Sequence, residues 1–156
     1  MSGCPISRNH KYFDYIEDLV EKAKHSDVRK KFAACIIKGK KIYSLGTNYH
    51  QLKNPISIHA EISTLHNLDK SIIQISKKQK NLDILIIRIN DTNKLKNSRP
   101  CKNCFNSLKS FGISRVFYSN TNGEIVFENV DEMIVDHYSS GFMFVHPEFF
   151  PYYVKS

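Results

Sequence analysis

The 156-residue chain carries 23 lysine and arginine residues against 15 aspartate and glutamate residues, which gives a formal net charge of +8. This length fits one compact domain that can bury its own core without disulfides, and no stretch reaches the roughly 18 apolar residues of a membrane-spanning helix. The first ten residues lack the basic start and apolar run of a secretory signal, so we expect a cytoplasmic protein that does not contact a membrane.

The positive charge favours anionic partners such as nucleotides, but only weakly. Lysine-rich runs such as 38–41 and 77–80 are typical of solvated turns, and nucleic acid stays open as a partner. The four cysteines are Cys4, Cys35, Cys101 and Cys104. In a reducing compartment such a set is not a disulfide framework, and the close pair indicates metal or redox chemistry.

A single domain is predicted over residues 1–156, with a core at about 10–130 and an aromatic-rich C-terminal extension at 131–156. In the first half, apolar spacing predicts a helix over 11–25 and two strands around a turn at 38–40. Ser57 is then a helix cap, and Ile58, Ile62, Leu65 and Ile72 form one buried helical stripe.

The second half begins with "LDILIIRI" (82–89), whose continuous apolar run is typical of a strand covered on both faces. A loop over 90–98 leads to a helix with Pro100 at its first position, ending near Gly112. Strands at 114–120 and 124–130 bracket "TNG", a turn that permits only an antiparallel pair. A short helix is predicted from Asp131, and the aromatic tail after it covers the core, forms an oligomer interface or closes over a substrate.

Cys101 and Cys104 lie three residues apart in the predicted first helical turn, on one face and within reach of a single metal ion. His59 is the third candidate ligand if the two helix starts are adjacent, and Glu61 converges on the same point. Three protein ligands leave an open position, as in catalytic zinc sites, where zinc brings the pKa of a bound water toward about 7. Glu61 would take the proton from that water.

Alternatives to this catalytic zinc site are a structural zinc site and a redox pair of cysteines. A structural site needs a fourth ligand, and His66 is excluded because seven helical residues place it roughly 10 Å from His59. His50 or Cys35 could reach the zinc ion as a fourth ligand, although neither accounts for a glutamate at position 61.

The motifs "HAE" at 59–61 and "PCKNC" at 100–104 resemble the zinc-dependent cytidine and deoxycytidylate deaminase superfamily. The order of predicted elements over about 10–130 is similar as well. The resemblance implies a three-layer α/β/α fold with a mixed central sheet and one zinc ion per chain, held by His59, Cys101 and Cys104. It also implies that a zinc-bound hydroxide attacks the amino-bearing ring carbon while Glu61 shuttles protons.

Substrate contacts are implied at three further positions. Asn48 matches an asparagine that many members place against the sugar, although an asparagine here could simply form a turn. Ala60, between the two motif residues, is expected to contact the substrate. Arg99 stands where many members have glutamate, and it could meet a phosphate or face solvent.

The short "TNG" connection resembles members that act on free nucleosides, because members acting on tRNA or polynucleotides commonly insert a helix there. We therefore expect hydrolytic deamination of a cytosine-containing nucleoside or nucleotide. The alternatives are an enzyme that edits single-stranded DNA or RNA and a catalytically silent zinc-binding interaction module. A homo-oligomer is a further expectation.

Overall fold

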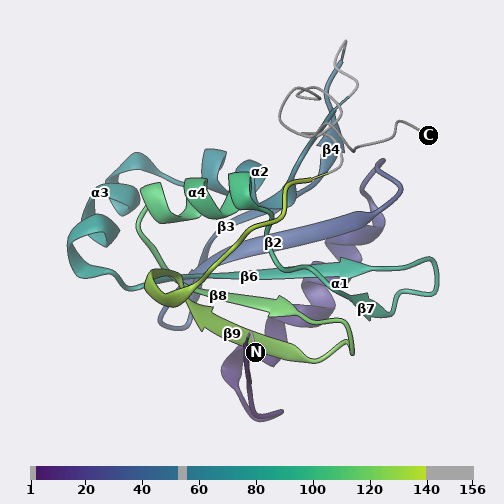
Figure 1. Cartoon of the computed structure of the whole chain (residues 1–156), viewed down its shortest axis with the longest axis horizontal. Helices are drawn as coiled ribbons and strands as arrows, with labels where there is room; N and C mark the ends of the chain where they lie inside the picture. The colour runs from purple at the N-terminus through teal and green to yellow at the C-terminus, as the bar shows by residue number, and fades with distance from the viewer. Residues whose placement is uncertain (1–2, 53–55, 140–156) are drawn as a thin grey trace.

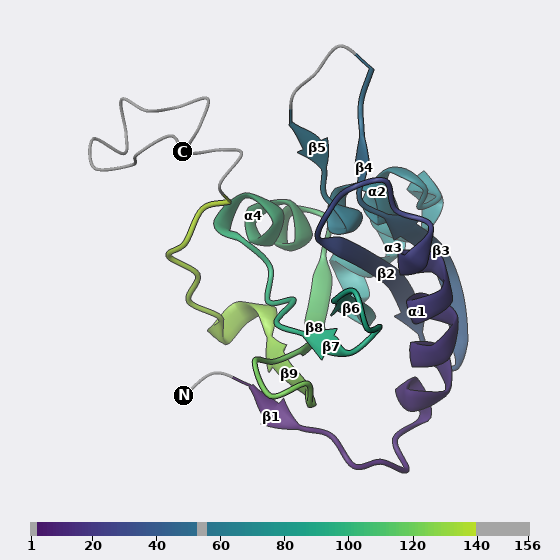
Figure 2. The ribbon, with the colours of Figure 1, turned by 90° about the vertical axis from the view of Figure 1, so that its right-hand side faces the viewer.

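The computed structural model of the chain describes residues 3–52 and 56–139. The expected three-layer α/β/α architecture is confirmed (Figures 1 and 2). One face of a mixed sheet is covered by α1 and the other by α2, α3 and α4. The helices are η1 (Lys11–Tyr15, a 3-10 helix), α1 (Ile16–Lys24), α2 (Ala60–His66), α3 (Lys70–Gln79), α4 (Lys102–Ser110) and η2 (Val130–Glu132, a 3-10 helix).

The main sheet of the described residues has the strand order β1-β9-β8-β6-β2-β3, with β7 paired to the end of β6. Strands β6 and β8 run parallel, and the other pairs are antiparallel. The strands are β1 (Cys4–Pro5), β2 (Lys31–Lys38), β3 (Lys41–Thr47), β6 (Leu82–Ile89), β7 (Leu95–Lys96), β8 (Ile113–Ser119) and β9 (Ile125–Asn129). A separate ribbon is formed by β4 (Tyr49–His50) and β5 (Ser57–Ile58).

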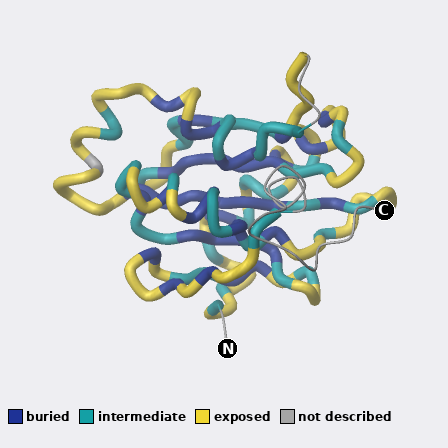
Figure 3. The backbone as a smooth tube through the Cα atoms, turned by 45° about the horizontal axis from the view of Figure 1, so that its top comes forward, coloured by how far each residue is buried: buried dark blue, intermediate teal, exposed yellow. Residues whose placement is uncertain are grey.

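Strand β6 lies between β2 and β8, as its apolar sequence predicts, and it divides the core into two parts. Because successive side chains of a strand point to opposite faces, Ile84 and Ile86 pack toward α2 and α4, whereas Leu85 and Ile87 pack toward α1. Figure 3 shows these buried strands through the centre of the molecule, with exposed residues concentrated in turns and helix surfaces.

Both predicted hairpins are present. Strands β2 and β3 join through Gly39, and β8 and β9 join through Gly123, with φ angles of 63° and 77° that favour glycine. The last two strands are therefore antiparallel, as the short connection requires. None of the helices among the described residues is both long and apolar enough to cross a bilayer.

The predicted start and length of the helix that carries "HAE" were wrong. Ser57 and Ile58 pair with β4 as strand β5, and the helix begins at Ala60 with His59 as its N-cap. The helix also ends at His66, so Ile72 belongs to α3. Asp69 causes this break, because its carboxylate accepts a hydrogen bond from the backbone N–H of Ser71 (2.8 Å) at the start of the new helix.

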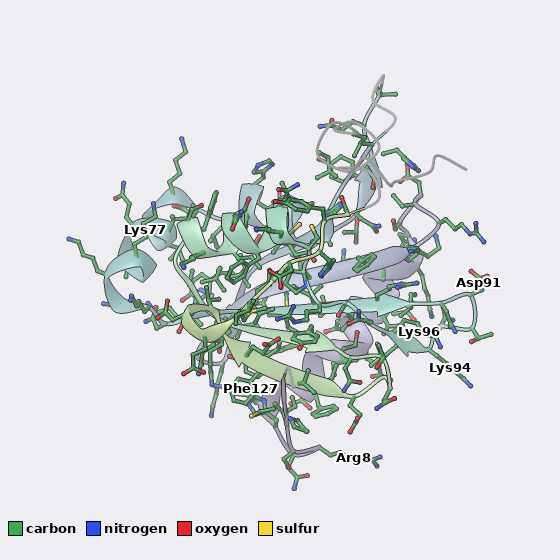
Figure 4. The ribbon with its side chains drawn as sticks, in the orientation of Figure 1. Arg8, Lys77, Asp91, Lys94, Lys96 and Phe127 are labelled. Atoms are coloured by element: carbon green, nitrogen blue, oxygen red, sulfur yellow. The ribbon has the colours of Figure 1, made fainter. Side chains whose placement is uncertain are left out.

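The prediction that Pro100 and Cys101 lie inside their helix was also wrong. Cys101 has an extended backbone and is the N-cap of α4, which starts at Lys102. The backbone N–H of Lys102 donates to the carbonyl of His137 (2.8 Å), a tertiary contact that no local pattern reveals. The preceding loop contains β7, and Figure 4 shows Lys94 and Lys96 projecting from this part of the chain.

Candidate metal centre and pocket

The two motifs meet because each lies at the start of a helix on the same face of the sheet, and α2 contacts α4. His59 and Cys101 are the two N-cap residues. An N-cap side chain usually accepts hydrogen bonds from its own helix, but neither of these side chains does so. Both are therefore free to face one another across the gap between the helices.

His59, Cys101 and Cys104 bring three metal-binding atoms together, all within 4.8 Å of one another. The Nδ1 atom of His59 lies 3.2 Å from Sγ of Cys104 and 3.7 Å from Sγ of Cys101. A tetrahedral zinc ion with ordinary Zn–N and Zn–S bonds separates its ligand atoms by about 3.5–3.8 Å. The donor set and its spacing thus fit one zinc ion per chain.

The electrostatics of the two thiols also suit a cation. A hydrogen bond from Cys104, partly opposed by burial and supported by His59, lowers the pKa of Cys101 to about 4. The same hydrogen bond, together with burial, raises the pKa of Cys104. The pair thus carries negative charge in a buried position, which a divalent ion can neutralise.

Glu61 lies in the first turn of α2 beside this group and is only 3% exposed. Burial raises the pKa of its carboxyl above the ordinary value, and the neighbouring His59 opposes that shift. A shift in this direction favours the protonated carboxyl, which suits a residue that holds and passes on a proton in general acid–base catalysis.

These residues open onto a cavity of about 510 Å³, a size typical of small-molecule sites. The cavity is lined by the segment before and at the start of β2, the end of β3, β5, the two motif helix starts, the end of β6, the loop after β7 and the segment after η2. The lining residues used below are Arg29, Lys30, Phe32, Asn48, His59, Ala60, Glu61, Arg88, Arg99, Cys101, His137 and Tyr138.

Asn48 lies at the cavity but is held by the protein itself. Its Oδ1 atom accepts hydrogen bonds from Ser26 Oγ (2.6 Å) and from the backbone N–H of Phe32 (3.0 Å), and its Nδ2 atom donates to the carbonyl of Lys30 (2.6 Å). This network fixes the start of β2 at the edge of the cavity. Ala60 also lines the cavity and is buried, and contact of either residue with a substrate stays a prediction.

Arg99 lines the cavity and is held by an ion pair within the protein. Its guanidinium pairs with Glu128, with Nε 2.9 Å from Oε2, and it donates to the carbonyl of Ile134 (2.9 Å). The side chain is 16% exposed, so it does not face open solvent. Although Arg99 borders the cavity, its charge is already neutralised, and a phosphate contact stays a prediction.

The other candidate ligands lie elsewhere. Cys35 is buried on the α1 face, His50 lies 3.5 Å from Asp27, and His66 ends α2 away from the helix start. Across residues 3–52 and 56–139, His59, Cys101 and Cys104 are the one group of His, Cys, Asp and Glu side chains placed to hold a metal ion.

Sequence reasoning missed six of these twelve lining residues, namely Arg29, Lys30, Phe32, Arg88, His137 and Tyr138. Arg88 could have been found, because it is the lone cation in the apolar run "LDILIIRI". His137 and Tyr138 follow η2 and could not, because only the contact with α4 brings that segment to the cavity. The aromatic tail from 140 onward lies outside the described residues.

Comparison with solved structures shows the fold. A cytidine deaminase from Burkholderia pseudomallei has a TM-score of 0.50 and 14% identity, covering 78% of this chain and 98% of that chain. Other matches include an apo dCMP deaminase from the cyanophage S-TIM5 (TM-score 0.45, 21% identity, 70% and 86% covered). A cytidine deaminase from Mycobacterium tuberculosis also matches (TM-score 0.47, 11% identity, 79% and 93% covered).

A comparison with curated protein sequences finds no match. Residues 6–120, however, match the family described as "Cytidine and deoxycytidylate deaminase zinc-binding region". The match spans most of the chain and contains both helix starts that form the metal centre. This chain therefore belongs to the cytidine and deoxycytidylate deaminase family.

Proposed function

We propose that the protein is a hydrolytic deaminase of a cytosine-containing nucleoside or nucleotide. The observation that carries the proposal is the position of Glu61, a buried carboxyl that borders the cavity beside the His59, Cys101 and Cys104 group. Holding a metal ion needs only the three ligands. An additional buried carboxyl at the cavity favours proton transfer to and from a bound substrate.

His59, Cys101 and Cys104 would hold the zinc ion, which supplies a water molecule activated for nucleophilic attack at neutral pH. Glu61 would take a proton from the attacking water as the water oxygen bonds to carbon 4 of cytosine, and it would deliver a proton to ring nitrogen 3. A second proton then passes to the amino group, the C–N bond breaks, and ammonia leaves as the carbonyl of uracil forms. Water is consumed and no redox partner is needed.

The first test is ammonia release from a panel of zinc-loaded reactions: cytidine, deoxycytidine, their monophosphates, purine nucleosides and single-stranded oligonucleotides. We expect turnover of at least one free cytosine compound. Ammonia released only from oligonucleotides would favour a nucleic-acid editing enzyme, and none from any substrate would overturn the proposal.

The second test is Glu61→Gln, which keeps the shape of the side chain but removes its proton transfer. We expect kcat to fall by about 10²–10⁴-fold, the usual contribution of general acid–base catalysis. Zinc content, measured by atomic emission, should stay at one per chain. An active Glu61→Gln enzyme would contradict the assigned role, and Asp14→Asn on the exposed surface of η1 serves as a carboxyl-to-amide control.

A further inference from the structure

Arg88 lies near the C-terminal end of β6, at the edge of the sheet that faces the metal centre. In the strand pairing it stands opposite Phe32 of β2, and by alternation it shares a face with Ile86, the face that α2 and α4 cover. Both Arg88 and Phe32 line the cavity that also contains Glu61 and Cys101. The guanidinium therefore belongs to the same cavity as the proposed reaction centre.

No described residue neutralises this guanidinium. The Nε atom of Arg88 is buried without a hydrogen-bond partner, and its contact is with the ring of Phe32, whose centroid is 5.9 Å from Cζ. Arg99 and Arg115, by contrast, each pair with a carboxylate, at 2.9 Å and 2.6 Å. A buried polar atom without a hydrogen-bond partner destabilises a protein, and an anionic ligand would supply that missing partner to Arg88.

The charges around the cavity indicate what kind of anion this is. Arg29 and Lys30 are exposed and also line it, while Glu61 is the one acidic residue among the described lining residues. A cytosine nucleoside is neutral, so positive charges around the cavity would not help to bind it. A phosphate monoester carries nearly two negative charges at pH 7, and its oxygens match the planar donors of arginine.

We propose that Arg88 binds the phosphate of a nucleoside monophosphate, so that the substrate is the nucleotide and not the free nucleoside. This inference rests on the proposed deaminase function. Arg88 fixes the phosphate at the end of β6, and Arg29 and Lys30 at the mouth of the cavity attract the dianion.

The kinetic test compares deoxycytidine with its 5′-monophosphate in the zinc-loaded wild type, Arg88→Gln and Arg88→Lys. We expect the ratio of kcat/KM for nucleotide over nucleoside to fall about 10–100-fold in Arg88→Gln, chiefly through KM, because a charge-assisted hydrogen bond is lost. Arg88→Lys should recover part of the ratio. Arg8→Gln is the matched control, since Arg8 is exposed and lies at the bottom of the view in Figure 4, beyond β9 and far from α2 and α4.

A binding test separates this inference from the proposed reaction. Calorimetry with the reaction products should show that wild type binds deoxyuridine monophosphate at least tenfold more tightly than deoxyuridine, and that Arg88→Gln removes the difference. The thermal midpoint of free Arg88→Gln should change little, because the variant loses the contact with the Phe32 ring but no carboxylate partner. Equal affinity for the two products, or an unchanged kinetic ratio in Arg88→Gln, would overturn the inference while deamination itself could stand.

An oligonucleotide arm distinguishes the source of the phosphate. A single-stranded oligonucleotide carries phosphodiesters instead of a terminal monoester. The oligonucleotide and a free nucleotide are each used to displace bound deoxyuridine monophosphate. If the oligonucleotide displaces it more strongly, and Arg88→Gln abolishes this effect, Arg88 binds the phosphate of a polynucleotide. The monophosphate inference then fails. If no substrate released ammonia but the protein still bound deoxyuridine monophosphate tightly, the proposed deaminase function would fail and the phosphate-binding role of Arg88 would stand.

Discussion

At the residue scale, the position of α2 depends on how closely its backbone approaches strand β3. Gly46 lies beneath the helix, and a Cβ atom placed there would come within 2.6 Å of Thr64 Oγ1 and 2.7 Å of the Thr64 backbone nitrogen. Thr64 is fully buried and its hydroxyl donates to the carbonyl of Ala60 (2.7 Å). Moving the backbone to make room for a side chain would cost free energy. The absence of a side chain at Gly46 therefore lets α2 pack closely on β3, and this packing fixes the distance of His59 and Glu61 from the sheet.

We therefore expect Gly46→Ala to lower the free energy of unfolding by about 1–3 kcal/mol, the usual cost of overpacking, and to reduce kcat by shifting Glu61. Chemical denaturation and steady-state kinetics measure the two effects. Gly39→Ala is the contrast, because its Cβ meets nothing within 4 Å and only its φ of 63° is strained. That variant should lose stability but keep its kcat, and a fully active, fully stable Gly46→Ala would contradict the packing argument.

At the element scale, Arg99 connects the segment before α4 to β9 and to the chain beyond η2. It pairs with Glu128 of β9 and donates to the carbonyl of Ile134, while Tyr118 of β8 donates to Glu128 (2.7 Å). Burial alone would raise the pKa of Glu128, but the hydrogen bonds from Arg99 and Tyr118 outweigh it and hold the pKa below its ordinary value. The network keeps the cysteine motif in place over the sheet.

Since the folded-state pKa of Glu128 is lowered, its stabilising effect is present above the unfolded pKa of about 4.5 and is lost as pH falls through the folded value. We expect Glu128→Gln to lower the free energy of unfolding by about 2 kcal/mol at pH 7. The difference from wild type should shrink below pH 4.5, as urea titrations at several pH values would show. A difference that is constant with pH, or equal to that of exposed Glu124→Gln, would argue against the ion pair.

At the scale of the whole molecule, the metal centre joins two helices whose ligands are about forty residues apart in the chain. An ion that binds the folded state and not the unfolded one stabilises the fold by mass action, by about 2.7 kcal/mol at a concentration a hundredfold above its Kd. Removal of the zinc ion by a chelator should therefore break the link between α2 and α4. The protein should then lose both activity and stability.

We expect zinc to raise the thermal midpoint of the metal-free protein by several degrees, and Cys104→Ser to abolish most of that rise. Differential scanning calorimetry with and without zinc provides the measurement. Cys4→Ser is the matched control, because Cys4 is exposed in β1 and distant from the motifs. If Cys104→Ser were stabilised by zinc as strongly as Cys4→Ser, the ligand assignment would be wrong.

Much of the architecture was predictable because its signals are local. The apolar run of β6 indicated a central strand, and Gly39 and Gly123 indicated two hairpins. The two motif helices start two residues later than predicted, because of tertiary contacts that local patterns do not reveal. Ser57 pairs with a distant strand, and Lys102 finds its hydrogen-bond acceptor in His137.

By itself, the sequence determined the family and the donor set of the metal centre, because "HAE" and "PCKNC" contain the histidine and the two cysteines that a zinc ion requires. Only the tertiary structure decided the surroundings of that centre. It pairs Arg99 with Glu128, and among the described residues it gives Arg88 no carboxylate partner. The physical reason is that an arginine is available to bind a ligand only if folding leaves its charge without a carboxylate partner. Such partners come from strands that are distant in the sequence.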